Sequence, residues 1–283
     1  MSGSAAGPLL AAGEALTGSG EGGVEVTLGL VLLLLAAGLV AGWLDAVVGG
    51  GGIIQLPALL LVPGITPVQA LATNKVGSIA GTTVSAATYL RRVSPDKSAA
   101  LPAAGLALVG AVLGAMLATV VPEAVFRPVI LVVIVGVALF TLLKPSLGAE
   151  AMLRYPPDSK RHHATAWALG FCVGVYDGVL GPGTGSFLVI GFVALLGFSF
   201  LQASASGKVV NWATNLGALL FFVPAGHVVW PLGLAVAAGN IAGGWLGART
   251  AIRLGSGFVR IVFIVVASLL VLTLGWDLLA SVL

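Results

Sequence analysis

The sequence has few charged residues and only one cysteine. Of its 283 residues, 8% are charged and 58% are hydrophobic, whereas soluble domains carry about 25% charged residues. No water-soluble core requires this much apolar surface, so the composition predicts a chain that lies in lipid. The single cysteine, Cys172, excludes a disulfide framework, a metal cluster of cysteines and a two-thiol redox site. Because Cys172 lies in an apolar run, we expect it to be a small buried residue.

Histidine is scarce, and the basic residues lie mainly in short loops between apolar segments. The net charge of +3 does not indicate a nucleic-acid partner, because the basic residues cluster in short loops and form no basic face. His162 and His163 fall in a charged loop, where we expect them to be solvated, and His227 falls in a loop on the other side of the membrane. An intramembrane enzyme would need a nucleophile with a base, or a metal cluster. We therefore predict no enzymatic activity, no metal site and no cofactor.

Apolar segments make up nearly all of the chain after residue 24. Residues 1–24 lack Lys and Arg and have no clean apolar core, so we predict a disordered non-cytoplasmic tail rather than a signal peptide. We expect ten segments, at 26–48, 53–62, 68–90, 99–121, 126–144, 164–181, 185–198, 203–223, 229–248 and 258–280. The second and seventh are shorter than the roughly 20 residues that span a bilayer. These two short segments are expected to be re-entrant half-helices or pieces of broken helices.

An acidic residue followed by a glycine loop occurs twice. Asp45 precedes the loop Gly49–Gly52, and Asp177 precedes the loop Gly181–Gly185, 132 residues later along the chain. Glycine allows consecutive backbone N–H groups to turn toward one point, and a half-helix that starts after the loop adds its positive end. Close helix packing is the alternative use of these glycines. Because each loop directly precedes a short segment, we favour an anion-binding role.

The segments divide into two repeats of opposite orientation. The first repeat covers 25–144, a cytoplasmic loop covers 145–163, and the second repeat covers 164–283. Basic residues concentrate in the loops after the third, fifth and ninth segments, and the positive-inside rule places these loops in the cytoplasm and both termini outside. Each repeat has an odd number of segments, so the second is inverted. The predicted fold is an all-α polytopic membrane protein with two inverted-topology repeats and glycine-broken or re-entrant half-helices near the midplane, a plan found in secondary transporters.

Two lysines follow the glycine loops inside apolar segments. A lysine at the bilayer centre costs about 2.5–3.5 kcal/mol, so Lys75 and Lys208 are expected to face a cavity or a partner, unless they extend to the interface. Asp45 and Asp177 have three possible roles: proton coupling, fixed pairing with the lysines, or contact with helix-end N–H groups. We treat them as coupling or structural carboxylates. The substrate-binding residues that we predict are Gly50, Gly51, Gly52, Gln55, Asn74, Lys75, Ser78, Gly183, Thr184, Gly185, Ser206, Lys208, Asn211 and Asn215.

At these residues the sequence resembles the TauE/SafE (TSUP) family of sulfite exporters and related anion permeases. The resemblance is carried by the loop after Asp45, by Ala72-Thr73-Asn74-Lys75, by the loop after Asp177, and by Ser206-Gly207-Lys208 with Asn211. It extends from about residue 25 to the C-terminus. What it implies is transport of sulfur-containing anions such as sulfite, organosulfonates including sulfoacetate, sulfate or thiosulfate.

We therefore expect a secondary transporter of small sulfur-containing oxyanions in the cytoplasmic (inner) membrane, with export by alternating access as the favoured direction. Three alternatives stay open: a proton-coupled importer of sulfate- or thiosulfate-type anions, a cation or metal permease that uses the two carboxylates, and a membrane assembly factor. The expected partners are a small anionic substrate and the lipid bilayer, with a homodimer left open and no nucleic acid.

Overall fold

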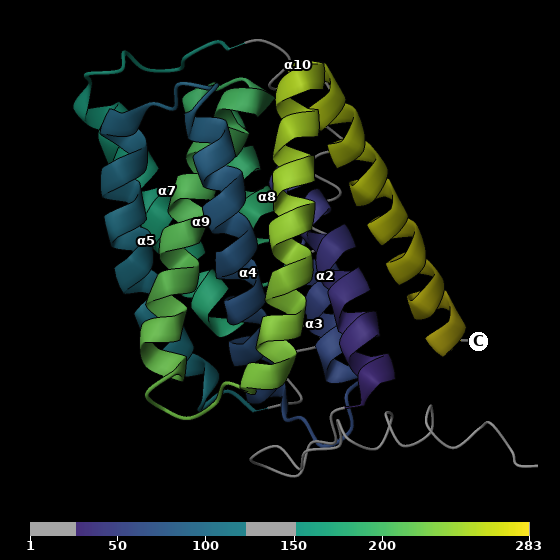
Figure 1. Ribbon diagram of the computed structural model, residues 1–283. Helices are drawn as coiled ribbons and strands as arrows, with labels where there is room; N and C mark the ends of the chain where they lie inside the picture. The colour runs from purple at the N-terminus through teal and green to yellow at the C-terminus, as the bar shows by residue number, and fades with distance from the viewer. Residues whose placement is uncertain (1–26, 123–150, 283) are drawn as a thin grey trace, which may run out of the picture.

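The computed structural model describes residues 27–122 and 151–282, and in these ranges the regular secondary structure is entirely helical (Figure 1). The first half of the chain contains α2 (Leu28–Val48), α3 (Gly52–Leu60), α4 (Pro67–Leu90) and α5 (Lys97–Ala118). The second half contains α7 (Lys160–Val179), α8 (Thr184–Gly191), a π-helical turn η1 (Phe192–Leu196), α9 (Phe200–Phe222) and α10 (Trp230–Val282). The short helix α3 packs against α2 and α4, and the short helix α8 packs against α7 and α9.

The helices confirm nine of the ten predicted segments, with boundaries that differ by a few residues. The helix α10 covers the last two predicted segments, because at Gly255 the backbone leaves the helical conformation (φ 77°, ψ −173°) and the helix changes direction. The predicted segment 126–144 and the predicted tail 1–24 lie outside the described residues.

Side-chain caps fix where several helices begin. Thr66 precedes α4, and its hydroxyl accepts a hydrogen bond from the N–H of Gln69, while the Gln69 side chain accepts one from the N–H of Thr66. This reciprocal capping box satisfies two N–H groups that a helix start leaves unpaired. Pro67 at the first helical position adds a preset φ. The long helix that carries Lys75 therefore has a well-defined start.

Small residues allow helices from different halves of the chain to pack closely. A Cβ atom added to Gly38 of α2 would lie 2.5 Å from the carbonyl oxygen of Val236 in α10. On the other side, a Cβ added to Gly174 of α7 would lie 2.3 Å from the carbonyl oxygen of Ala107 in α5. Small residues at helix crossings are the usual means of association in membranes. Both close contacts join the first half to the second, so the two halves interleave rather than form separate bundles.

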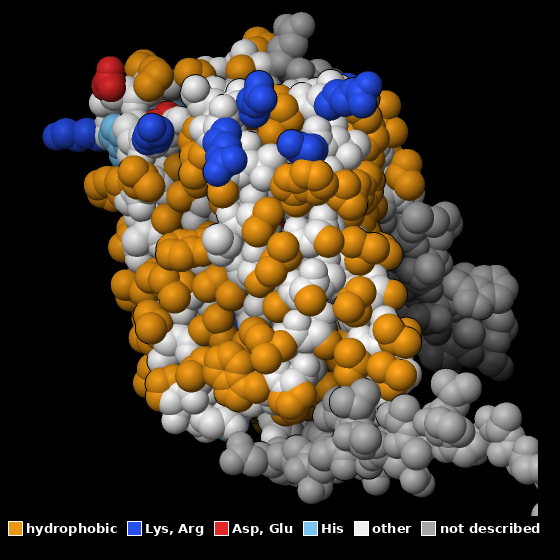
Figure 2. Space-filling view, viewed as in Figure 1, with side chains coloured by type: hydrophobic (Ala, Val, Ile, Leu, Met, Phe, Trp, Pro, Cys, Tyr) orange, Lys and Arg blue, Asp and Glu red, His pale blue; other side chains and the backbone are white. Residues whose placement is uncertain are grey.

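The sides of the bundle are apolar, and the basic residues gather at one end (Figure 2). Exposed leucines and valines cover α2 and α5, including Leu32, Leu33 and Val109. Of the described helices, α2 and α5 are long and apolar enough to cross a membrane by length and composition. The helices α4 and α9 carry buried polar residues such as Asn74 and Asn211, which lower their hydropathy.

The expectation that His162 is solvated is wrong. The helix α7 begins at Lys160, inside the predicted loop, and this start places the His162 ring in a buried position. Its Nε2 atom lies 2.9 Å from Oδ2 of Asp96, the residue that caps α5. Partial burial acts to raise the pKa of Asp96, but hydrogen bonds from Ser98, from the N–H of Ala99 and from His162 together hold it below its usual value. This contact joins the starts of α5 and α7.

The expectation that Cys172 is buried is also wrong. Its side chain is exposed on α7. Its neighbour Phe171 is exposed as well, whereas the core-facing side of the helix is occupied by Gly170 and Gly174. An apolar run in a membrane helix does not distinguish a face turned to the core from a face turned to lipid, so the sequence pattern could not place this residue.

Candidate functional site

The two glycine loops contact each other at the centre of the bundle. Gly49 ends α2 in the left-handed conformation (φ 81°), and its carbonyl oxygen accepts a hydrogen bond of 3.1 Å from the N–H of Ser186. A Cβ atom added to Gly49 would lie 2.0 Å from the carbonyl carbon of Gly185. A Cβ added to Gly185 would in turn lie 2.5 Å from Cα of Gly49. Only glycine permits this approach, so these two residues are required for packing as well as for any role in binding.

The lysines and aspartates form two ion pairs that cross between the halves. The Nζ atom of Lys75 lies 2.8 Å from Oδ1 of Asp177 and 2.7 Å from the Asp177 carbonyl oxygen. The Nζ atom of Lys208 lies 2.7 Å from Oδ2 of Asp45. Both ammonium groups are buried, so neither extends to the interface. Pairing with the lysines, one of the three roles that the sequence left open for the carboxylates, is present in the structure.

The loops and ion pairs surround a small cavity. Its volume is about 10 Å³, which is close to the room that one water molecule needs. The cavity takes its walls from both loops, from α4 and from α9. Its lining residues are Asp45, Gly49, Gly52, Asn74, Lys75, Ser78, Asp177, Gly181, Gly183, Thr184, Gly185, Asn211 and Asn215.

Backbone donors and side-chain acceptors in this cavity lack partners. The N–H groups of Gly52, Gly183 and Gly185, at the starts of α3 and α8, donate to no acceptor in the described part of the chain. A helix start leaves such groups free and carries a partial positive charge. Two buried oxygens, Oδ1 of Asn74 and Oδ2 of Asp177, also lack a hydrogen-bond partner there. The cavity can therefore offer several donors and two acceptors to a small polar ligand.

The ion pairs leave the cavity wall without a large net charge. Each ammonium group is neutralised by a carboxylate at hydrogen-bonding distance. What remains is the field of two helix N-termini, which favours an anion. A cation would have to compete with the ammonium groups for the carboxylates. Among the described residues there is also no group of three or more His, Cys, Asp or Glu side chains that could hold a metal ion.

The structure brings most of the predicted site residues together. Of the predicted substrate-binding residues, those that line the cavity are Gly52, Asn74, Lys75, Ser78, Gly183, Thr184, Gly185, Asn211 and Asn215, and both predicted carboxylates join them. Gly49 and Gly181 also line it. They were absent from the predicted binding set, although their places in the two glycine loops could have included them.

Five predicted binding residues do not line the cavity. Two of them bond to residues that do line it. Lys208 donates a hydrogen bond to the Asp45 carboxylate, and Gln55 accepts a 3.3 Å hydrogen bond from the hydroxyl of Ser78. A Cβ on Gly51 would lie 2.6 Å from the carbonyl oxygen of Ala41, so Gly51 serves the packing of the loop against α2. The two others, Gly50 and Ser206, are buried.

An all-α bundle with apolar sides and a polar cavity between two broken helices has the features of a polytopic membrane transporter. Residues 34–274 match the family described as "Sulfite exporter TauE/SafE". The chain belongs to this family, as the resemblance in its glycine loops and lysine stretches predicted.

Relatives in several bacteria carry transporter names. The chain is 37% identical over 246 residues to the "Probable membrane transporter protein ORF9" of a Sinorhizobium species, covering 87% of this chain and 92% of the relative. It is 33% identical over 250 residues to the "Probable membrane transporter protein YfcA" of Escherichia coli K12, with 88% and 90% covered. A "Probable membrane transporter protein" of Haemophilus influenzae is 30% identical over 258 residues, with 90% and 98% covered. No solved structure matches the chain.

Proposed function

We propose that the protein is a secondary transporter that exports small sulfur-containing oxyanions, such as sulfite, sulfoacetate or a related organosulfonate, across the cytoplasmic membrane. The observation that carries this proposal is the set of unpaired N–H groups of Gly52, Gly183 and Gly185 at one buried cavity. Oxyanions accept hydrogen bonds from such groups without needing a full positive charge. The family name supports the choice of sulfite as the first substrate to test.

Two inverted repeats would provide the moving parts. The helices α7, α8 and α9 follow one another in the same order as α2, α3 and α4, and in Figure 1 α2 begins at the lower end of the bundle whereas α7 begins at the upper end. The crossed ion pairs tie the two repeats together at the midplane. A cavity with room for about one water must widen before an oxyanion enters. Rocking one repeat against the other would open it to each side in turn.

The membrane potential favours export. A negative-inside potential drives a monoanion outward with about 2.3 kcal/mol per charge per 100 mV, so export needs no coupled proton. In this proposal the basic end of the bundle faces the cytoplasm and both termini lie outside.

Proton-coupled import is the second candidate, and one observation favours it. Oδ2 of Asp177 is buried without a partner. A carboxylate oxygen in that position is a place where a proton can bind, and uptake of an anion against the potential requires such coupling. Uniport of a monoanion carries charge and responds to an imposed potential, whereas symport of a monoanion with one proton is electroneutral and does not, so one assay distinguishes them.

Flux in proteoliposomes tests the proposal. We expect saturable sulfite flux that increases when the compartment holding the sulfite is made negative. The double variant Asp45→Asn/Lys208→Met removes one ion pair without leaving a lone charge, and we expect it to lower the flux about tenfold or more, the usual effect of losing hydrogen bonds to a charged group. The control is Lys160→Met, because Lys160 is exposed at the start of α7, far from the cavity residues in the chain.

Two results would contradict this proposal. Full flux in the double variant would place the substrate site elsewhere. Uptake that requires an inward proton gradient, and that loses this requirement in Asp177→Asn, would replace export by proton-coupled import.

A further inference from the structure

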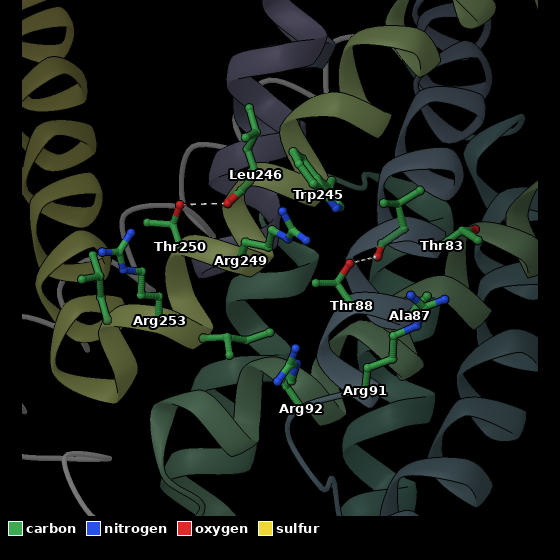
Figure 3. A pocket seen from close by; sticks show the side chains of 13 residues that line it. Thr83, Ala87, Thr88, Arg91, Arg92, Trp245, Leu246, Arg249, Thr250 and Arg253 are labelled. Atoms are coloured by element: carbon green, nitrogen blue, oxygen red, sulfur yellow. Dashed lines mark hydrogen bonds between the residues drawn. The ribbon is translucent and has the colours of Figure 1, made fainter.

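A second, larger pocket lies between α4 and α10, at the end of the bundle where the basic residues gather (Figures 2 and 3). Its volume is about 990 Å³, and it shares no lining residue with the central cavity. Its lining includes Arg91, Arg92, Trp245, Leu246, Arg249 and Arg253. The size is that of sites for drug-sized ligands and is far larger than a sulfite ion needs.

Four arginines give this pocket a strong positive charge. Arg91 and Arg92 follow the end of α4, and Arg249 and Arg253 lie one helical turn apart on α10. All four side chains are exposed, and none forms an ion pair with a carboxylate in the described part of the chain. Figure 3 shows the α4 arginines and Arg249 bordering the same space. The pocket therefore has guanidinium donors available for an anionic group.

The threonine hydroxyls of the pocket already donate hydrogen bonds to carbonyl oxygens of their own helices. The hydroxyl of Thr88 donates to the carbonyl oxygen of Val84 (2.7 Å), and that of Thr250 donates to Leu246 (2.8 Å). The guanidinium carbon of Arg249 lies 4.1 Å from the centroid of the Trp245 ring, a cation–π contact that holds this arginine at the pocket wall. The charge of this pocket therefore comes from its arginines.

The other part of the pocket lining is apolar and continues into the apolar sides of the bundle. Leu246 and Leu254 are 45% and 53% exposed, and Trp245 is 41% exposed. Tryptophan is enriched at the boundary between headgroups and acyl chains. A ligand that fits must combine a compact anionic group with apolar chains. A free phosphate or sulfite ion supplies only the first of these.

We infer that this pocket binds the headgroup of an anionic phospholipid, with the phosphodiester at the arginines and the start of an acyl chain on Leu246 and Leu254. Basic pockets between transmembrane helices bind anionic headgroups in this way, and arginine suits phosphate because its donors are arranged as a planar fork. This site goes beyond the proposed transport function and does not depend on which substrate the central cavity carries.

The test is lipid binding to the purified full-length protein, measured by native mass spectrometry. The probes are phosphatidylglycerol and cardiolipin, compared with phosphatidylcholine. We expect the anionic lipids to bind and to remain after delipidation, and phosphatidylcholine not to. In Arg249→Gln/Arg253→Gln we expect anionic lipid binding to weaken about thirtyfold, the effect of losing two basic contacts at a membrane surface.

Two matched variants separate the pocket from net charge and from folding. Arg154→Gln/Lys160→Gln removes the same charge from exposed residues outside the pocket, and it should bind lipid as the wild type does. Arg249→Lys/Arg253→Lys keeps the charge, and it should retain binding to within about tenfold.

Two results would overturn the inference. The first is an equal loss of lipid binding in the pocket variant and in the Arg154→Gln/Lys160→Gln control. The second is displacement of bound lipid from the wild type by millimolar inorganic phosphate or sulfite, which would make the pocket a site for free oxyanions.

Discussion

The two buried ion pairs occupy corresponding positions in the two halves, but their surroundings differ. Asp177 is 2% exposed, and it accepts hydrogen bonds from Lys75 and, at 2.5 Å, from the hydroxyl of Thr184. Asp45 is 14% exposed, and Lys208 is its one side-chain donor in the described part of the chain. The position that corresponds to Thr184 in the first half is Gly52, which has no hydroxyl to offer.

This difference teaches that a duplicated sequence pattern does not duplicate an environment. The pair that contains Asp177 is almost completely buried, and we call it the dry pair. It has additional hydrogen bonds, so we expect it to stabilise the junction of the two halves. The pair that contains Asp45 is partly accessible and has fewer bonds to break. We expect this second pair to separate first when the cavity widens.

The largest expected effect comes from removing one charge of the dry pair. Asp177→Asn leaves the Lys75 ammonium buried without its carboxylate, which costs about 3–5 kcal/mol in comparable buried pairs. Asp45→Asn should cost clearly less, because solvent reaches that pair. The measurement is the thermal unfolding midpoint of each variant in the same detergent. Equal losses in the two variants would remove the distinction between the pairs.

The next prediction compares the loss of stability when each of the two loop glycines that follow these aspartates is replaced by alanine. Gly49 and Gly181 both have a positive φ, 81° and 85°, so an alanine at either suffers strain of about 1–2 kcal/mol. A Cβ at Gly49 would lie 2.0 Å from the backbone of Gly185, whereas at Gly181 the nearest atom is Nζ of Lys75, at 3.0 Å.

We therefore expect Gly49→Ala to be less stable than Gly181→Ala by about 1–3 kcal/mol, the usual cost of overpacking. Unfolding midpoints of the two variants measure the difference. Gly105→Ala is the control for a simple change to alanine, because a Cβ there has no neighbour within 4 Å. A larger loss at Gly181 would show that the loops do not pack as described.

The last comparison concerns the hydroxyl that only one pair has. Thr184→Val removes the hydrogen bond to Asp177 while keeping the shape of the side chain, and we expect a loss of about 1.5–3 kcal/mol, the range for bonds to charged groups. Thr119→Val is the matched control, since its hydroxyl bonds only to the carbonyl oxygen of Met116 at an exposed helix end. If both variants lose the same stability, the extra bond of Asp177 contributes nothing special.

Much of the fold could be predicted because its signals are local. Segment lengths, the two glycine loops and the charges within apolar runs are all visible along the chain, and they located α3, α8 and most of the cavity. The crossing of the pairs was not predictable, because either lysine could pair with either aspartate until α4 and α9 are placed in space. His162 was misassigned for the same reason, since its partner Asp96 lies 66 residues away.

The arginine pocket shows a different limit. Arg91, Arg92, Arg249 and Arg253 were interpreted only as topology signals, because a single helix end with basic residues is ordinary in a membrane protein. Their meeting at one pocket depends on α4 packing against α10, and no pattern within either segment indicates that contact.

In each crossed ion pair, one residue is synthesised well before its partner. Lys75 and its partner Asp177 are 102 residues apart, and Asp45 and its partner Lys208 are 163 residues apart. At a synthesis rate of about 5–20 residues per second, Lys75 precedes its partner by roughly 5–20 seconds. During that time the first half of the chain holds an acid and a base whose final partners have not yet been made. The insertion machinery must therefore accommodate both charges until the second half arrives.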